Sequence, residues 1–61
     1  MCEFNIILDD QKVFGDAIYA KVDGNIVTVK NVIGGLQEYK NVKITEVDIT
    51  TAKLVLETVK T

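Results

Sequence analysis

Cys2, the only cysteine of the chain, is the residue whose type and position most directly suggest chemistry. A thiolate is a soft metal ligand, and the backbone nitrogen of the same residue can join it in a five-membered chelate ring. If Met1 is removed, that nitrogen is the α-amine of Cys2, which a metal can deprotonate together with the thiol near neutral pH. If Met1 stays, the Cys2 amide must ionise instead, and the Met1 amine is a further donor. Glu3 is a candidate outer donor.

Cys2 also fits a purely structural interpretation. It falls on the same face of an extended segment as Phe4, Ile6 and Leu8. A free cysteine behaves as a small apolar residue in such a position. On the same interpretation, Glu3 is a solvated acid on the opposite face of the strand.

The length and composition of the chain favour a homodimer. A chain of 61 residues buries only about 60% of the surface that its unfolded form exposes. One cysteine and no histidine exclude an internal disulfide and a closed zinc site from one chain. Two chains would also complete the ligand set, with two sulfurs and two nitrogens. Square-planar donors suit Ni(II) or Cu(II), a tetrahedral arrangement suits zinc, and ligand softness permits Cu(I).

Apolar residues alternate with polar ones along nearly the whole chain, which predicts an all-β fold. We expect five or six short antiparallel strands that form one small barrel over residues 1–61. Val27, Val29, Val47, Ile49, Leu54 and Leu56 are expected to point inward. A terminal helix over residues 51–61 is the competing interpretation, and the β-branched residues there argue against it.

Turn residues divide the predicted strands. Asp9-Asp10 and Asp23-Gly24 predict hairpin turns, and Gly34-Gly35 and Thr51-Ala52 predict two further breaks. Gly15 predicts a bulge inside the second strand. The apolar phase slips near residues 40–41, which predicts a bend or bulge there.

The chain resembles the CooT family of small nickel-binding proteins, which are associated with the maturation of carbon monoxide dehydrogenase. The resemblance covers length and element order along nearly the whole chain. The matching stretches are Met1-Cys2-Glu3, Asp23-Gly24, Ile33-Gly34, Glu46-Val47-Asp48-Ile49 and Leu54-Val55-Leu56-Glu57. The resemblance implies an Sm-like barrel, a homodimer, Ni(II) bound through Cys2, and a role in nickel storage or delivery to a metalloenzyme maturation partner.

RNA binding is an alternative function, since members of that family have also been labelled as predicted RNA-binding proteins. The residues that favour it are the lysines, the amide and the aromatic ring around the Gly34-Gly35 loop: Lys30, Asn31, Tyr39, Lys40 and Lys43. The net charge of −2 and the absence of arginine argue against nucleic acid. A protein-interaction barrel and an unligated structural dimer are the remaining alternatives.

Composition also bears on catalysis and location. Without histidine the chain lacks the ordinary general base, and no phosphate-binding glycine loop is present, so we expect no enzymatic activity. Glu3 and Asn5 interrupt the first apolar run, so we expect neither a signal peptide nor a membrane span. An unpaired cysteine is typical of a reducing compartment, which predicts a cytoplasmic protein.

Overall fold

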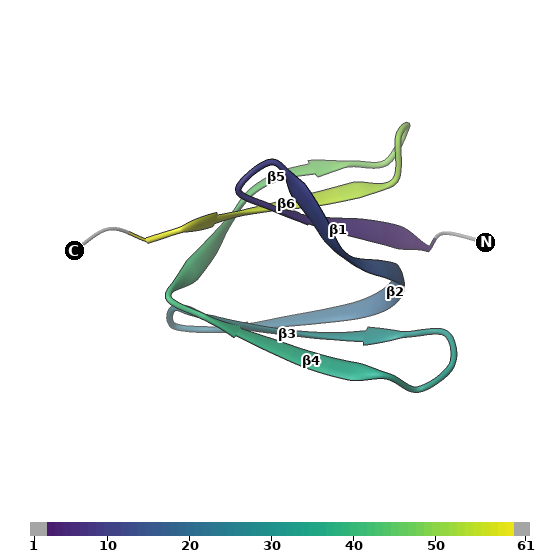
Figure 1. Cartoon of the computed structure of the whole chain (residues 1–61), viewed down its shortest axis with the longest axis horizontal. Coiled ribbons are helices and arrows are strands. Elements are labelled where there is room, and N and C mark those ends of the chain that lie inside the picture. The colour runs from purple at the N-terminus through teal and green to yellow at the C-terminus, as the bar shows by residue number, and fades with distance from the viewer. Residues whose placement is uncertain (1–2, 60–61) are drawn as a thin grey trace.

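Strand β1 (Phe4–Leu8) lies between two neighbours and holds the sheet together. The computed structural model describes residues 3–59. The other strands are β2 (Gln11–Asp23), β3 (Ile26–Asn31), β4 (Leu36–Lys40), β5 (Val42–Asp48) and β6 (Lys53–Thr58). They form one sheet in the order β4-β3-β2-β1-β6-β5. Figure 1 shows the sheet curling so that β1, β5 and β6 face β2, β3 and β4.

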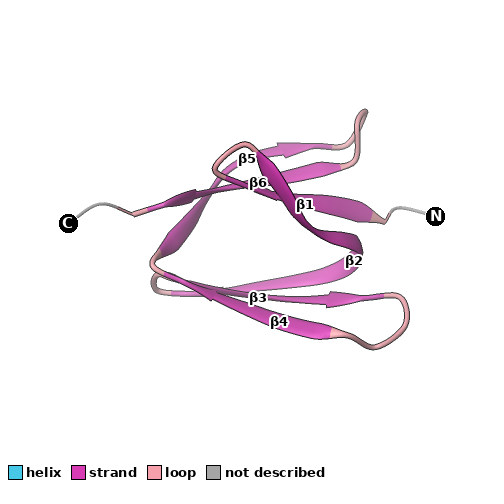
Figure 2. Ribbon diagram, viewed as in Figure 1, coloured by secondary structure: helices cyan, strands magenta, loops and turns pink. Residues whose placement is uncertain are grey.

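The predicted all-β fold with six strands is confirmed, and Figure 2 shows strands and loops only. The terminal segment forms β6 rather than a helix. The prediction of a fully antiparallel sheet is wrong, because β1 and β6 pair in parallel. Turn residues in the sequence predict pairing only between strands that follow one another along the chain. Because β1 and β6 are the first and last strands, no turn residue predicts how they pair. Closure into a barrel is not seen in the pairings of residues 3–59, since β4 and β5 are the two edge strands.

Most of the predicted turns and breaks are confirmed. Asp9 and Asp10 both have positive φ (49° and 69°), as a tight two-residue hairpin turn requires. Gly24 has φ +60° between β2 and β3, and Ala52 has φ +55° between β5 and β6. The predicted bend near residues 40–41 is a break between β4 and β5, where Asn41 has φ +59°.

The pairings of the long strand β2 contain three register shifts. Phe4 pairs with Ala17 while Ile6 pairs with Phe14, so β2 has one extra residue in this stretch. The bulge predicted at Gly15 is therefore confirmed, although the residue with positive φ is Asp16 (56°). Two further register shifts were not predicted: Ile6 and Ile7 pair with Phe14 and Lys12, and a further extra residue lies between Ala17 and Tyr19. Each extra residue bends the strand and increases its twist, so β2 can belong to both halves of the curled sheet.

The core lies inside the curl. Ile6, Val27, Val29 and Leu56 are completely buried. The full set of buried apolar residues is Ile6, Ala17, Val27, Val29, Val42, Leu54 and Leu56. Val27, Val29, Leu54 and Leu56 thus point inward as predicted. Val47 and Ile49, which were also predicted to point inward, are exposed, with exposed fractions of 57% and 75%.

Two leucines provide a matched test of this core. Replacing Leu56, which is fully buried, with alanine should lower the free energy of unfolding by about 2–5 kcal/mol, because lost apolar contacts and a residual cavity both cost stability. Replacing Leu36, which is 63% exposed, should change it by no more than about 0.5 kcal/mol. Urea unfolding followed by circular dichroism measures both. Equal losses in the two variants would contradict this assignment of the core.

Candidate functional site

The start of β1 lies in a crowded part of the fold. The Asn5 amide donates a hydrogen bond of 2.8 Å to the carbonyl of Ala52, which fixes β1 against the turn between β5 and β6. On the other side, Phe4 pairs with Ala17 of β2. Figure 1 shows the start of β1 at the same end of the molecule as the β3–β4 and β5–β6 turns. Residues from four strands therefore surround Phe4.

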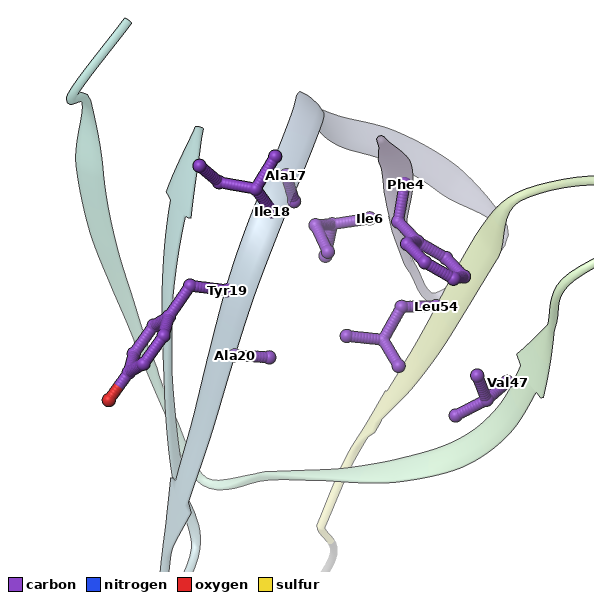
Figure 3. A pocket seen from close by; sticks show the side chains of 8 residues that line it. All are labelled: Phe4, Ile6, Ala17, Ile18, Tyr19, Ala20, Val47 and Leu54. Atoms are coloured by element: carbon purple, nitrogen blue, oxygen red, sulfur yellow. The ribbon is translucent and has the colours of Figure 1, made fainter. Parts of the chain in front are cut away.

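An open apolar groove of about 180 Å³ lies beside Phe4. Figure 3 shows side chains from β1, β2, β5 and β6 around it. Its lining residues are Phe4, Ile6, Ala17, Ile18, Tyr19, Ala20, Val47 and Leu54. Sites for drug-sized molecules usually occupy about 300–1,000 Å³, so this groove has the size for one or two side chains.

The groove exists because part of the inner face of the sheet has no cover. Val47 lies opposite Leu54 in the β5–β6 ladder, so it faces inward as its position in the strand predicts. Ala20 lies opposite the fully buried Val29 and also faces inward, yet it is exposed. The edge strands β4 and β5 have no ladder between them within residues 3–59, so nothing there shields these side chains. The alternating pattern thus predicted the face on which Val47 lies, but it does not show what covers that face.

Some exposed apolar residues line this groove, and others belong to the turns at the same end of the molecule. The large hydrophobic residues with substantial exposure are Val13, Ile18, Tyr19, Val22, Val32, Ile33, Leu36, Val47 and Ile49. Seven of them belong to the β3–β4 and β5–β6 turns, their adjoining strand ends, or the part of β2 that pairs with the end of β3. Clusters of exposed hydrophobic residues mark interaction surfaces in small globular domains.

The predicted metal ligands lie at the edge of the described chain. Met1 and Cys2 are outside the described residues. Glu3 is half-buried and precedes β1. Among residues 3–59, no three side chains of the His, Cys, Asp or Glu type come together in a way that could hold a metal ion.

The candidate RNA-binding residues do not form one surface. Lys30 follows the buried Val29 on β3 and therefore faces outward. Lys40 follows Tyr39, the inward-facing partner of the buried Val27, and therefore faces outward as well. Tyr39 pairs with Val27 and packs against the core on the inner side. Burial raises the pKa of Tyr39. A partly buried ring on the other side of the sheet cannot stack on a base held by these lysines.

Asn31 and Lys43 are equally separate. The Asn31 side-chain oxygen accepts a hydrogen bond of 2.7 Å from the Gly35 amide, so it holds the β3–β4 turn. Lys43 is exposed on β5, opposite Glu57 of β6. The five residues chosen from the sequence are therefore distributed over both faces of the sheet and two strand pairs.

A scan against protein-family models gives no match for this chain, and a search of curated proteins gives no significant match. Residues 3–59 contain no helix with the length and apolarity needed to cross a bilayer. The groove and the exposed apolar residues form the candidate functional site. Sequence reasoning missed Ile18 and Tyr19 because the bulge in β2 that sets their directions has no glycine or other turn residue to mark it.

Asp48 fixes the turn that carries Val47 and Ile49. Its Oδ1 accepts hydrogen bonds from the Thr50 hydroxyl (2.6 Å), the Thr50 amide (3.0 Å) and the Thr51 amide (3.3 Å). These bonds, the one from the Thr50 side chain foremost, lower the pKa of Asp48. Because the folded-state pKa is depressed, the stabilising effect is present above the unfolded-state pKa. It is lost as the pH falls through the folded-state pKa.

Replacing Thr50 with alanine should therefore raise the pKa of Asp48 toward that of an unstructured aspartate, because the shortest hydrogen bond to the carboxylate is removed. The contribution of Asp48 to the free energy of unfolding, which is lost at low pH, should become smaller as its pKa rises. Carboxyl-carbon NMR titration measures the pKa. Thr45→Ala is the matched control, since the Thr45 hydroxyl bonds the carbonyl of Val55. An unchanged pKa in the Thr50 variant would show that the backbone amides alone set it.

Proposed function

We propose that this protein is a small homodimer that binds Ni(II) through the Cys2 residues of its two chains. Its role is nickel storage or delivery during the maturation of a cytoplasmic metalloenzyme. The resemblance to the CooT family supports the metal and the role. The observation that carries the dimer is the uncovered apolar groove beside the start of β1.

The groove connects the dimer with Cys2. Phe4 lines the groove, and two peptide units separate it from Cys2, a length that spans at most about 7 Å. A second copy that covers this end of the molecule would bring two chain starts to one interface. In a two-fold symmetric dimer each chain presents the same patch to the other, so residues near the axis meet their own copies. Such an arrangement is what a shared Cys2 site requires.

The exposed surface is large enough for this interface. A stable interface of standard size takes about 800 Å² from each partner. The chain exposes 4290 Å², so the dimer would cover about a fifth of it. Ile18 and Val47, the exposed aliphatic residues that line the groove, would lie at the centre of that area.

The donor set fits Ni(II) only when it is shared. One chain offers the Cys2 thiolate and one nearby nitrogen, and residues 3–59 add no cluster of further ligands. Two chains offer two thiolates and two nitrogens, a set that satisfies four-coordinate Ni(II) in square-planar geometry. Glu3 is half-buried beside this position, where its carboxylate can hydrogen-bond a ligating nitrogen and so orient it.

Titration of Ni(II) into the full chain tests the metal site. We expect thiolate charge-transfer and d–d bands that saturate at one ion per two chains. Cys2→Ser should abolish the charge-transfer band, whereas Glu3→Gln should keep it because Glu3 is not a ligand. Mass spectrometry of the same samples shows whether Met1 is retained and so which nitrogen is available. Identical spectra for wild type and Cys2→Ser would refute the metal site.

A pair of valines tests the dimer. Val47→Glu places a charge in the groove and should weaken dimerisation on the order of tenfold or more, because a desolvated unpaired charge is costly. Val13→Glu, on the part of β2 that pairs with β1 and outside the groove, should leave dimerisation unchanged. Sedimentation velocity across concentration measures both. A monomeric wild type, or equal weakening by both variants, would contradict an interface at the groove.

A further inference from the structure

The turn between β3 and β4 is held rigidly. Besides the bond from Gly35 to the Asn31 side chain, the Asn31 amide donates to the carbonyl of Gly35 (2.9 Å) and the Gly34 amide donates to the carbonyl of Asn31 (3.1 Å). The Val32 amide donates to the carbonyl of Asp16 (3.1 Å), which ties the turn to the bulge in β2. Four hydrogen bonds thus fix a four-residue connection.

Both glycines are required by this geometry. Gly34 has φ +86°, a conformation that residues with a side chain rarely adopt. A Cβ atom at Gly35 would lie 2.9 Å from the Asn31 side-chain amide, so any larger residue would displace the side chain that holds the turn. The sequence therefore specifies one conformation of this loop, and it does so around residues that do not contribute to the core.

The residues displayed by this rigid turn are apolar. Ile33 is 87% exposed, and Val32 and Leu36 are also exposed. A solvated turn needs polar residues at such positions, and placing Ile33 in water gains nothing for stability. A preorganised loop that presents apolar side chains lowers the entropy that a binding partner must overcome.

One cation is fixed within the same surface. Tyr19, Lys30 and Leu36 form a row across β2, β3 and β4 on the outer face. The Lys30 ammonium lies 4.4 Å from the centroid of the Tyr19 ring, a cation–π contact that restricts where its charge is placed. Figure 3 shows the Tyr19 ring pointing away from the side chains that line the groove. We call Tyr19, Lys30, Val32, Ile33 and Leu36 the hairpin patch.

We propose that the hairpin patch is a docking surface for a protein segment that carries apolar side chains next to a carboxylate. The apolar side chains pack on Ile33 and Leu36, and the carboxylate pairs with Lys30. Lys30 and Leu36 lie on the outer face of the β2–β3–β4 sheet, and the Tyr19 ring points away from the groove that Tyr19 also lines, so a homodimer formed at the groove can still use this surface. The inference does not depend on metal binding.

Charge favours a protein segment with a carboxylate over two other occupants, a second copy of the chain and an anionic membrane. In a second copy docked symmetrically on the hairpin patch, Lys30 would approach its own counterpart, and like charges in an interface oppose association. An anionic membrane attracts clusters of basic residues, whereas this patch contains one lysine in a chain of net charge −2. A carboxylate on a protein segment matches the single fixed cation.

Selection of a phage-displayed random peptide library on the immobilised full chain tests the proposal. Enriched peptides should carry Asp or Glu beside apolar residues. Their affinity should fall on the order of tenfold or more for Lys30→Glu and for Ile33→Ser. It should be unchanged for Lys40→Glu, a lysine at the far end of the same outer face, and for Val13→Ser. Exchanging the peptide acid for lysine should restore binding to Lys30→Glu.

Three results would overturn the proposal. The first is a lack of enrichment, or enriched peptides that bind all variants equally. The second is binding to phosphatidylserine vesicles that Ile33→Ser abolishes, which would assign the hairpin patch to a membrane. The third is self-association that Ile33→Ser removes and Val47→Glu leaves intact, which would assign it to a second copy. Because all these variants retain Cys2, their Ni(II) spectra report separately on the proposed function.

Discussion

The two-sided pairing of β1 is the constraint on which the rest of the structure depends. β1 pairs with β2 in antiparallel and with β6 in parallel, so five residues connect the two halves of the molecule. Ile6, at the centre of β1, is completely buried and lies opposite Phe14 and Leu54. With so short a central strand, the sheet can surround only a small core, and its long strands must bend to do so. The bulges of β2 and the break at Asn41 provide that bending.

Curling around a small core has a consequence for the surface. The inner face is longer than the core that it encloses, because β2 and β5 continue past the buried residues. Val47 and Ala20 lie on that excess length and face inward without cover. Residues 3–59 provide no further element that covers them, so a surface that would be core in a larger domain becomes available for association.

The sequence predicted the features that local chemistry determines. The alternating pattern predicted strands, and the Asp-Asp and Asp-Gly pairs predicted turns, because positive φ restricts which residues fit. The parallel β1–β6 pair joins segments at opposite ends of the chain, so no local signal marks it. The candidate RNA-binding residues were chosen by type near one loop, and the register places Tyr39 and Lys30 on opposite faces. Cys2 precedes the described residues, and its proposed role rests on its chemistry and on the family resemblance.

The bulge of β2 between Ala17 and Tyr19 links the groove and the hairpin patch. In a regular strand that starts with Ala17 inward, Tyr19 would also point inward and Ala20 outward. The extra residue between Ala17 and Tyr19 reverses both directions, so that Tyr19 lies beside Lys30 outside and Ala20 lies opposite Val29 inside. Without it, a tyrosine ring would fill the groove and Lys30 would lose its aromatic neighbour. This one extra residue therefore leaves the groove open on the inner face and places the Tyr19 ring in the hairpin patch on the outer face. The shared dependence on one residue argues that the groove and the hairpin patch belong to a single functional arrangement.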